Sequence, residues 1–149
     1  MTKNKIENAK KLLRSGELVI FPTETVYGLG GNANDKNAIR RIYNIKKRPA
    51  NNPIICHFKS LNEIKKDFYL SELEELLAKK LWPGPITLIL RKKTNSKISQ
   101  LVSNKSSYIG CRIPKDRIAL QLLKSLNFPV AAPSANFSER TSVTKFEDL

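Results

Sequence analysis

Short apolar runs of strand length alternate along this chain with segments whose apolar residues recur at helical spacing. Strand-like runs cover residues 18–21, 53–58, 86–91, 108–113 and 129–132. Helical spacing or a capping residue predicts helices at residues 6–13 and 118–123, and helices that begin at Asp35, Ser60 and Ser71. Because helices and strands interleave throughout, the sequence predicts an α/β fold with a mixed sheet. The length of 149 residues is typical of one domain, so we expect a single domain over residues 1–149.

Two segments rich in glycine or proline are expected to interrupt this pattern. Residues 22–31 begin with a proline and contain three glycines, and they predict a long loop after the first strand. Residues 82–85 contain two prolines and a glycine, which cannot continue a helix, so they predict a turn. The helix that begins at Asp35 is expected to end in the basic residues 46–48, where Pro49 stops it.

The composition favours a folded protein without a membrane segment. Hydrophobic residues make up 40% of the chain, yet no stretch approaches the roughly 20 apolar residues of a membrane helix. The first fifteen residues interleave lysine with isoleucine and leucine, so we expect no secretory signal. Cys56 and Cys111 lie in apolar runs without metal-ligand spacing and are expected to be buried thiols. We therefore expect a cytoplasmic protein that has no membrane partner.

The excess of positive charge allows two interpretations. Lysine and arginine number 27 against 13 acidic residues, which gives a formal charge of +14. Such a charge is typical of proteins that bind a polyanion, either nucleic acid, a nucleotide or an acidic membrane. Lysines make up 19 of the 27 basic residues, however, and much of the charge could simply be solvated. Composition alone does not decide which polyanion, if any, is bound.

A glycine pattern at Gly28-x-Gly30-x-x-Ala33 resembles a dinucleotide-binding fingerprint. Residues 22–27 separate the preceding strand from the first glycine, however, where the fingerprint needs a tight turn. No acidic residue for a ribose follows about 20 residues further on. A phosphate-binding loop of the GxxxxGK[ST] type is also absent from the sequence. This alternative is therefore disfavoured.

Three further segments could carry chemistry. His57 follows Cys56, but one histidine and one cysteine are too few for zinc, and neighbours on a strand point to opposite faces. His57 is thus either a structural residue or a polar contact in a pocket. Residues 46–53 place cations and amides on a stiff loop, which suits phosphate binding or a solvated surface. Residues 131–136 deliver a hydroxyl and an amide beyond the carboxyl end of a strand, where α/β folds bind ligands.

Six ordered motifs together resemble the YrdC/Sua5 family, the threonylcarbamoyl-AMP synthases of tRNA modification. They are Pro22-Thr23-Glu24-Thr25-x-Tyr27-Gly28-Leu29, Lys46-x-Arg48-Pro49-x-x-Asn52-Pro53, His57, Trp82-Pro83-Gly84-Pro85-x-Thr87, Gly110-x-Arg112-Ile113-Pro114 and Ala132-Pro133-Ser134-Ala135-Asn136. The resemblance runs from about residue 16 to residue 144, which is nearly the whole chain.

The resemblance implies a fold and a reaction. The fold would be a YrdC-like domain, a twisted mixed sheet flanked by helices with a concave, basic face. The reaction would join L-threonine, bicarbonate or CO₂, and ATP to give L-threonylcarbamoyl-AMP and pyrophosphate. Downstream transfer proteins would then pass the threonylcarbamoyl group to adenosine 37 of tRNA, giving threonylcarbamoyladenosine (t6A).

The resemblance also implies roles for residues at the family's motif positions. Lys46 and Arg48 match a Lys-x-Arg motif that handles the triphosphate, and they are the expected catalytic residues. The residues expected on the threonine side are Thr23, Thr25, His57, Arg112 and Ser134. The residues expected to bind ATP are Lys46, Arg48, Asn52, Tyr108, Asn136 and Thr144. Mg²⁺ would accompany ATP and take its ligands mainly from phosphates and waters, because Glu24 is the one obvious carboxylate nearby.

Two departures from the family pattern shape the remaining expectations. Ser138-Glu139 stands where the family usually has Ser-Gly. The family continues for several dozen residues with Ser-Thr-Val and Arg-x-Gly motifs that help to close the nucleotide site. Residues 144–147 have the form of a capping box shortly before the last residue, so a C-terminally shortened domain is expected. Two alternatives stay open: a double-stranded RNA or tRNA-binding module without catalysis, and an inactive shortened homologue.

Overall fold

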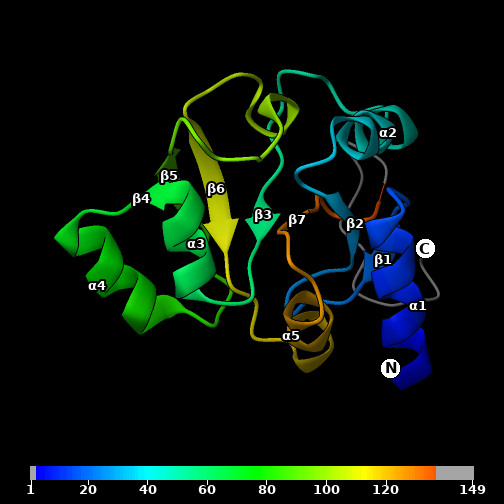
Figure 1. Cartoon of the computed structure of the whole chain (residues 1–149), viewed down its shortest axis with the longest axis horizontal. Coiled ribbons are helices and arrows are strands. Elements are labelled where there is room, and N and C mark those ends of the chain that lie inside the picture. Colours follow the sequence, from blue (N-terminus) through cyan, green and yellow to red (C-terminus); the bar gives the residue numbers. More distant parts are fainter. Residues whose placement is uncertain (1–2, 137–149) are drawn as a thin grey trace.

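The computed structural model describes residues 3–136, which form a seven-stranded sheet with helices on both faces (Figure 1). The helices are α1 (Lys3–Arg14), α2 (Lys36–Lys46), α3 (Leu61–Asp67), α4 (Glu72–Leu81), the 3₁₀ turn η1 (Gln100–Ser103) and α5 (Arg117–Lys124). The strands are β1 (Val19–Phe21), β2 (Gly28–Asn32), β3 (Cys56–His57), β4 (Phe68–Tyr69), β5 (Leu88–Lys92), β6 (Tyr108–Arg112) and β7 (Val130–Ala131). The predicted α/β class with a mixed sheet is confirmed.

The strand order of the sheet is β1-β2-β7-β3-β6-β5-β4. Strands β3 and β6 pair in parallel, and every other neighbouring pair is antiparallel. The two parallel strands thus lie at the centre and end at the same edge, so their last residues meet. Figure 1 shows α3 and α4 beside the β4–β5 end of the sheet, and α1 and α2 beside the β1–β2 end.

Three helices begin at the capping residues that the sequence predicts. The Asp35 carboxylate accepts hydrogen bonds from the backbone N–H groups of Asn37 and Ala38, which caps α2. Ser60 caps α3, and Ser71 forms a complete capping box with Glu74 at the start of α4. None of the helices within residues 3–136 is long and apolar enough to span a membrane.

The prediction of a long glycine loop over residues 22–31 is wrong in its second half. Residues Gly28–Asn32 form β2, a buried strand that pairs with β1 and β7. A Cβ atom on Gly30 would lie 2.7 Å from both the Phe21 ring and a methyl group of Val130. The neighbouring strands therefore fill the space that a side chain would need, and the glycines permit close packing instead of a loop. The predicted strand over residues 53–58 is also shorter than expected, because the Ile54 N–H donates to the Val102 carbonyl outside the sheet.

Substituting Gly30 with alanine is expected to lower the free energy of unfolding by about 2 kcal/mol, because the added methyl group overpacks a buried strand. Gly28→Ala is the matched control, since its Cβ would lie no closer than 3.4 Å to any neighbour. Urea denaturation of both variants measures the difference. Equal stability of the two variants would contradict the packing argument.

The core forms one cluster on each face of the sheet. Neighbouring residues of a strand belong to different clusters, as their alternation requires: Ala131 packs with α2, α3 and α4, and Val130 packs with α1 and α5. Cys56 and Cys111 are register partners in the first cluster, both buried and both free thiols, as predicted. His57 and Arg112 are the next register pair and therefore point to the other face.

Candidate active site

The five residues expected on the threonine side line a single small cavity of about 50 Å³. Thr23 and Thr25 come from the segment before β2, His57 and Arg112 from the ends of the central strands, and Ser134 from the segment after β7. The other lining residues are Val26, Gly28, Ile55, Ala132 and Pro133. Residues that are up to 111 positions apart in the sequence thus meet at the carboxyl ends of β3 and β6.

Backbone contacts fix the three segments to one another. Gly28 and Ser134 form an isolated antiparallel bridge, and the Leu29 N–H donates to the Pro133 carbonyl at 3.0 Å. The Ala132 N–H donates to the Ile55 carbonyl at 3.0 Å. Hydrogen bonds of the main chain therefore hold the cavity walls.

Arg112 is the most constrained charged residue of the cavity. It is buried, and its Nε donates to the Gly84 carbonyl at 3.1 Å while its Nη1 donates to the Thr25 hydroxyl at 3.1 Å. Its Nη2 lies 2.8 Å from Glu24 Oε1 as an ion pair, although this nitrogen has no well-aligned hydrogen bond among the described residues. The turn at residues 82–85 and the segment before β2 thus both hold the guanidinium.

Glu24 is a site residue whose link to Arg112 the sequence does not predict. Its carboxylate accepts hydrogen bonds from the backbone N–H groups of Lys115 at 3.1 Å and Asp116 at 3.4 Å. Burial by itself would raise the pKa of Glu24, but the Arg112 guanidinium and the Lys115 N–H outweigh it and lower the pKa. Glu24 therefore remains ionised and balances the buried charge of Arg112.

Thr23 and Thr25 shape the rim of the cavity. The Thr23 hydroxyl donates to the Val26 carbonyl at 2.6 Å and accepts from the Thr25 and Val26 N–H groups. The two threonine hydroxyls lie 3.0 Å apart. This turn orients the Thr25 hydroxyl toward Arg112, so the hydroxyl and guanidinium form one polar surface.

His57 is buried against the edge of the Phe21 ring, with ring centroids 5.7 Å apart. Burial, followed by the positive charge of Arg112, lowers the pKa of His57 to about 4. Its Nδ1 has no hydrogen-bond partner within residues 3–136. His57 is thus a neutral imidazole among the residues that line the cavity.

The depressed pKa of His57 predicts a pH dependence of stability. Between about pH 4 and pH 6.5 the unfolded chain binds a proton at His57 that the folded chain does not bind. The free energy of unfolding therefore falls as the pH drops through this range, by up to about 3 kcal/mol from this residue. Urea titrations from pH 7 to pH 4 should show a weaker dependence in His57→Asn, and identical slopes would contradict the assignment.

The predicted triphosphate residues lie on the adjoining end of α2 and its loop. Lys46 is the last residue of α2 and is buried, and its Nζ donates to the backbone carbonyls of Ser134 and Asn136. Burial, followed by the charge of Arg48, lowers the pKa of Lys46. Arg48 donates to the Asn52 side-chain oxygen at 2.8 Å and to the backbone carbonyl of Asn52 at 2.9 Å. Ser134 lines the cavity and also contacts Lys46, so it joins the two groups of predicted residues.

This chain is similar to known proteins both in sequence and in fold. The Sua5/YciO/YrdC family model, described as telomere recombination, matches residues 11–149. The chain belongs to this family.

The Sua5/YciO/YrdC relatives include two named threonylcarbamoyl-AMP synthase. The one from Pyrococcus abyssi is 45% identical over 94% of this chain and 41% of its own length. The one from Bacillus subtilis is 41% identical over 97% of this chain and 42% of its own length. The structure of P. abyssi Sua5 in complex with L-threonine has a TM-score of 0.94 and 42% identity, covering 99% of this chain and 43% of that one. The chain spans about two fifths of the length of these relatives.

Of the residues predicted to bind ATP, Tyr108 lies apart from the cavity and Thr144 lies outside the described residues. Tyr108, Gly110 and Arg112 alternate along β6 and share a face, but Tyr108 lies at the opposite end, about 13 Å from Arg112. Its side chain is half exposed, so its expected role in ATP binding stays a prediction. Thr144 and the predicted features at 138–139 and 144–147 lie outside the described residues.

Residues 3–136 offer no protein cage for a divalent metal. They contain no group of three or more histidine, cysteine or acidic side chains placed to hold an ion. Glu24, the one carboxylate expected nearby, is engaged by Arg112 and by two backbone N–H groups. The expectation that Mg²⁺ accompanies ATP and is held mainly by phosphates and waters therefore stays a prediction.

Proposed function

We propose that this chain forms L-threonylcarbamoyl-AMP and pyrophosphate from L-threonine, bicarbonate or CO₂, and ATP, for t6A modification of tRNA. The observation that carries the proposal is the meeting of five family motif residues in one cavity beside Lys46. The names of the relatives and the threonine complex of P. abyssi Sua5 support it.

The cavity offers the groups that an amino acid substrate requires. The Thr23, Thr25 and Ser134 hydroxyls and the neutral His57 can hydrogen-bond a threonine hydroxyl or amine, and Arg112 carries the charge that a carboxylate needs. The threonine amine would take up CO₂ as a carbamate, and a carbamate oxygen would attack the α-phosphate of ATP. Such phosphoryl chemistry depends mostly on positioning and on neutralising charge.

Lys46 and Arg48 are proposed to neutralise the triphosphate, with Asn52 and Asn136 as further contacts. Lys46 would turn from the carbonyls of Ser134 and Asn136 toward phosphate, or hold that segment while Arg48 makes the contact. Mg²⁺ bound to ATP would supply the remaining charge neutralisation. Separate transfer proteins are proposed to pass the threonylcarbamoyl group on to tRNA.

Pyrophosphate release tests the proposed reaction. We expect release only when ATP, L-threonine and bicarbonate are all present, and we expect Thr25→Val to abolish this threonine-dependent release. ATP turnover that is indifferent to threonine would contradict the proposal. Salt-sensitive binding of double-stranded RNA without any pyrophosphate release would instead favour the RNA-binding alternative.

A further inference from the structure

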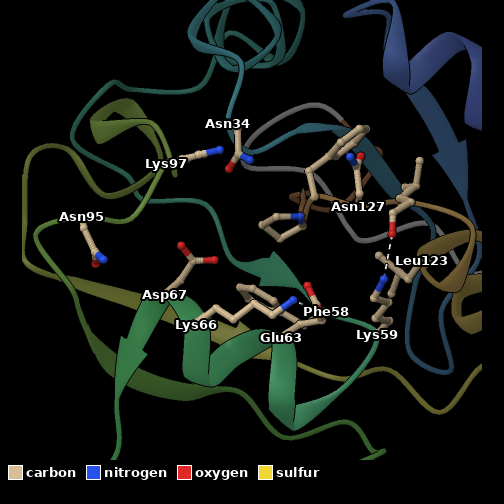
Figure 2. Close-up of a pocket in the computed structure, with 13 residues that line it drawn as sticks. Asn34, Phe58, Lys59, Glu63, Lys66, Asp67, Asn95, Lys97, Leu123 and Asn127 are labelled. Carbon is tan, nitrogen blue, oxygen red and sulfur yellow. Dashed lines mark hydrogen bonds and ion pairs between the residues drawn. The ribbon is translucent and has the colours of Figure 1, made fainter.

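A second and larger cavity, of about 240 Å³, opens near the end of β3 and away from the candidate active site. Phe58, in its floor, belongs to the core cluster on the opposite face of the sheet from His57. Residues of α3, the loop before η1, the turn before α2, and the end of α5 with the segment after it contribute to its walls (Figure 2). The candidate active-site cavity shares no lining residue with it.

The cavity combines an apolar wall with a polar opening. Phe58, Leu123 and Leu126 are buried core residues that form part of the wall. Two of the lysines that line it are already engaged: Lys59 Nζ donates to the Leu126 carbonyl at 3.0 Å, and Lys66 pairs with Glu63 at 2.7 Å. These contacts engage two of the three lysines that line the cavity and leave Lys97 as the third.

Three polar groups of the cavity have no partner within the described part of the chain. Asn34 Oδ1 is buried and accepts no hydrogen bond. The carboxylate of half-buried Asp67 and the ammonium of exposed Lys97 face no hydrogen-bond or ion-pair partner among residues 3–136, so water can solvate them in the free protein. Figure 2 shows the Asp67 carboxylate pointing into the cavity from α3, with Asn34 and Lys97 on the opposite side. Because a buried acceptor without a partner is unfavourable, a ligand donor at Asn34 Oδ1 would be favourable.

We propose that this cavity binds a free α-amino acid with an apolar side chain, at a site separate from the threonine site. The ligand ammonium would donate to Asp67 and to Asn34 Oδ1. Lys97 would pair with the ligand carboxylate, assisted by the amides of Asn95 and Asn127 at the opening. The ligand side chain would lie against Phe58 and Leu123. The volume of the cavity suits a molecule of this size and is below the range typical of larger ligands.

Other ligand classes fit this set of groups less well. A metal ion would find at most two carboxylates here, Glu63 and Asp67, and Glu63 is paired with Lys66. An inorganic anion or a nucleotide phosphate would meet the negative charge of Asp67 and only one uncommitted ammonium, that of Lys97. A zwitterion uses both charges together with the buried Asn34 oxygen.

Amide chemical shifts of the whole chain test the proposal, with L-leucine and L-methionine as probes at millimolar concentration. We expect shifts at Asn34, Asp67 and Asn127, with binding weakened at least tenfold in Asp67→Asn and in Lys97→Gln. Glu7→Gln and Lys80→Gln remove the same charges elsewhere on the surface and should leave the affinity unchanged. Leucinamide, which lacks the carboxylate, and N-acetyl-leucine, which lacks the ammonium, should each bind at least tenfold more weakly than leucine.

Each remaining outcome would overturn the proposal. These outcomes are an absence of shifts with both probes, shifts confined to residues around Thr25 and Arg112, or undiminished binding of N-acetyl-leucine or of leucine to Asp67→Asn. Repeating the titration in Arg112→Lys separates the two sites. Leucine shifts at Asp67 should persist in that variant even if threonine binding or pyrophosphate release is absent.

Discussion

Replacing Arg112 with methionine is expected to lower the free energy of unfolding by about 3 kcal/mol and to abolish threonine binding. Methionine fills much of the same volume but leaves Glu24 without its ion-pair partner and Gly84 and Thr25 without their donor. Glu24 is itself only partly buried, so the expected loss of stability lies at the low end of the range for breaking a buried ion pair. Urea denaturation measures the stability, and calorimetric titration with L-threonine measures the binding.

A double-mutant cycle with Glu24 separates the ion pair from the loss of packing. Glu24→Gln alone should destabilise the protein less, because Arg112 keeps its bonds to Gly84 and Thr25. The double variant Glu24→Gln/Arg112→Met should lose less stability than the sum of the single changes, since neither charge is then left alone. Strict additivity, or an Arg112→Met variant as stable as the wild type, would show that the pair does not organise the cavity.

The sequence predicts the fold well wherever local chemistry determines it. Asp35, Ser60 and Ser71 begin helices because their side chains can bond the free N–H groups of a first turn, whatever surrounds them. Strand β2 is missed because its glycines carry no strand signal of their own. Their place is set by the Phe21 ring and by Val130, which is about 100 residues away in the sequence.

The candidate site likewise has features that local sequence patterns predict and features that depend on distant residues. Alternation along a strand predicts that Cys56 and His57 point to opposite faces, and the structure confirms it. The pairing of Glu24 with Arg112 joins positions 88 residues apart, and no spacing rule links them. The cavity at Asn34, Asp67 and Lys97 likewise arises from segments that only the tertiary fold brings together. The ordered family motifs contain the residues of the candidate active site, whereas Asn34, Asp67 and Lys97 belong to no motif.

Replacing Lys46 with methionine is expected to reduce threonine-dependent pyrophosphate release by at least about 100-fold, the order of loss seen when one charge-stabilising donor is removed. The Lys46 ammonium is buried at the end of α2 and contacts the backbone of the segment that carries Ser134 and Asn136. Its removal takes a positive charge from the proposed triphosphate site and also loosens that segment. The affinity for ATP, measured by calorimetric titration, should fall together with the rate.

Lys47→Met is the matched control, because Lys47 is the next residue, is exposed and carries the same charge. Its left-handed backbone, with φ of 49°, accommodates methionine as well as lysine, since both side chains are unbranched at Cβ. We expect Lys47→Met to keep nearly all of the activity, so that a large difference between neighbouring lysines reports position and not net charge. Urea denaturation of both variants shows whether a loss of rate follows from unfolding. If the two variants lost activity equally while remaining folded, Lys46 would contribute only to the general positive charge, and its proposed place beside the triphosphate would be wrong.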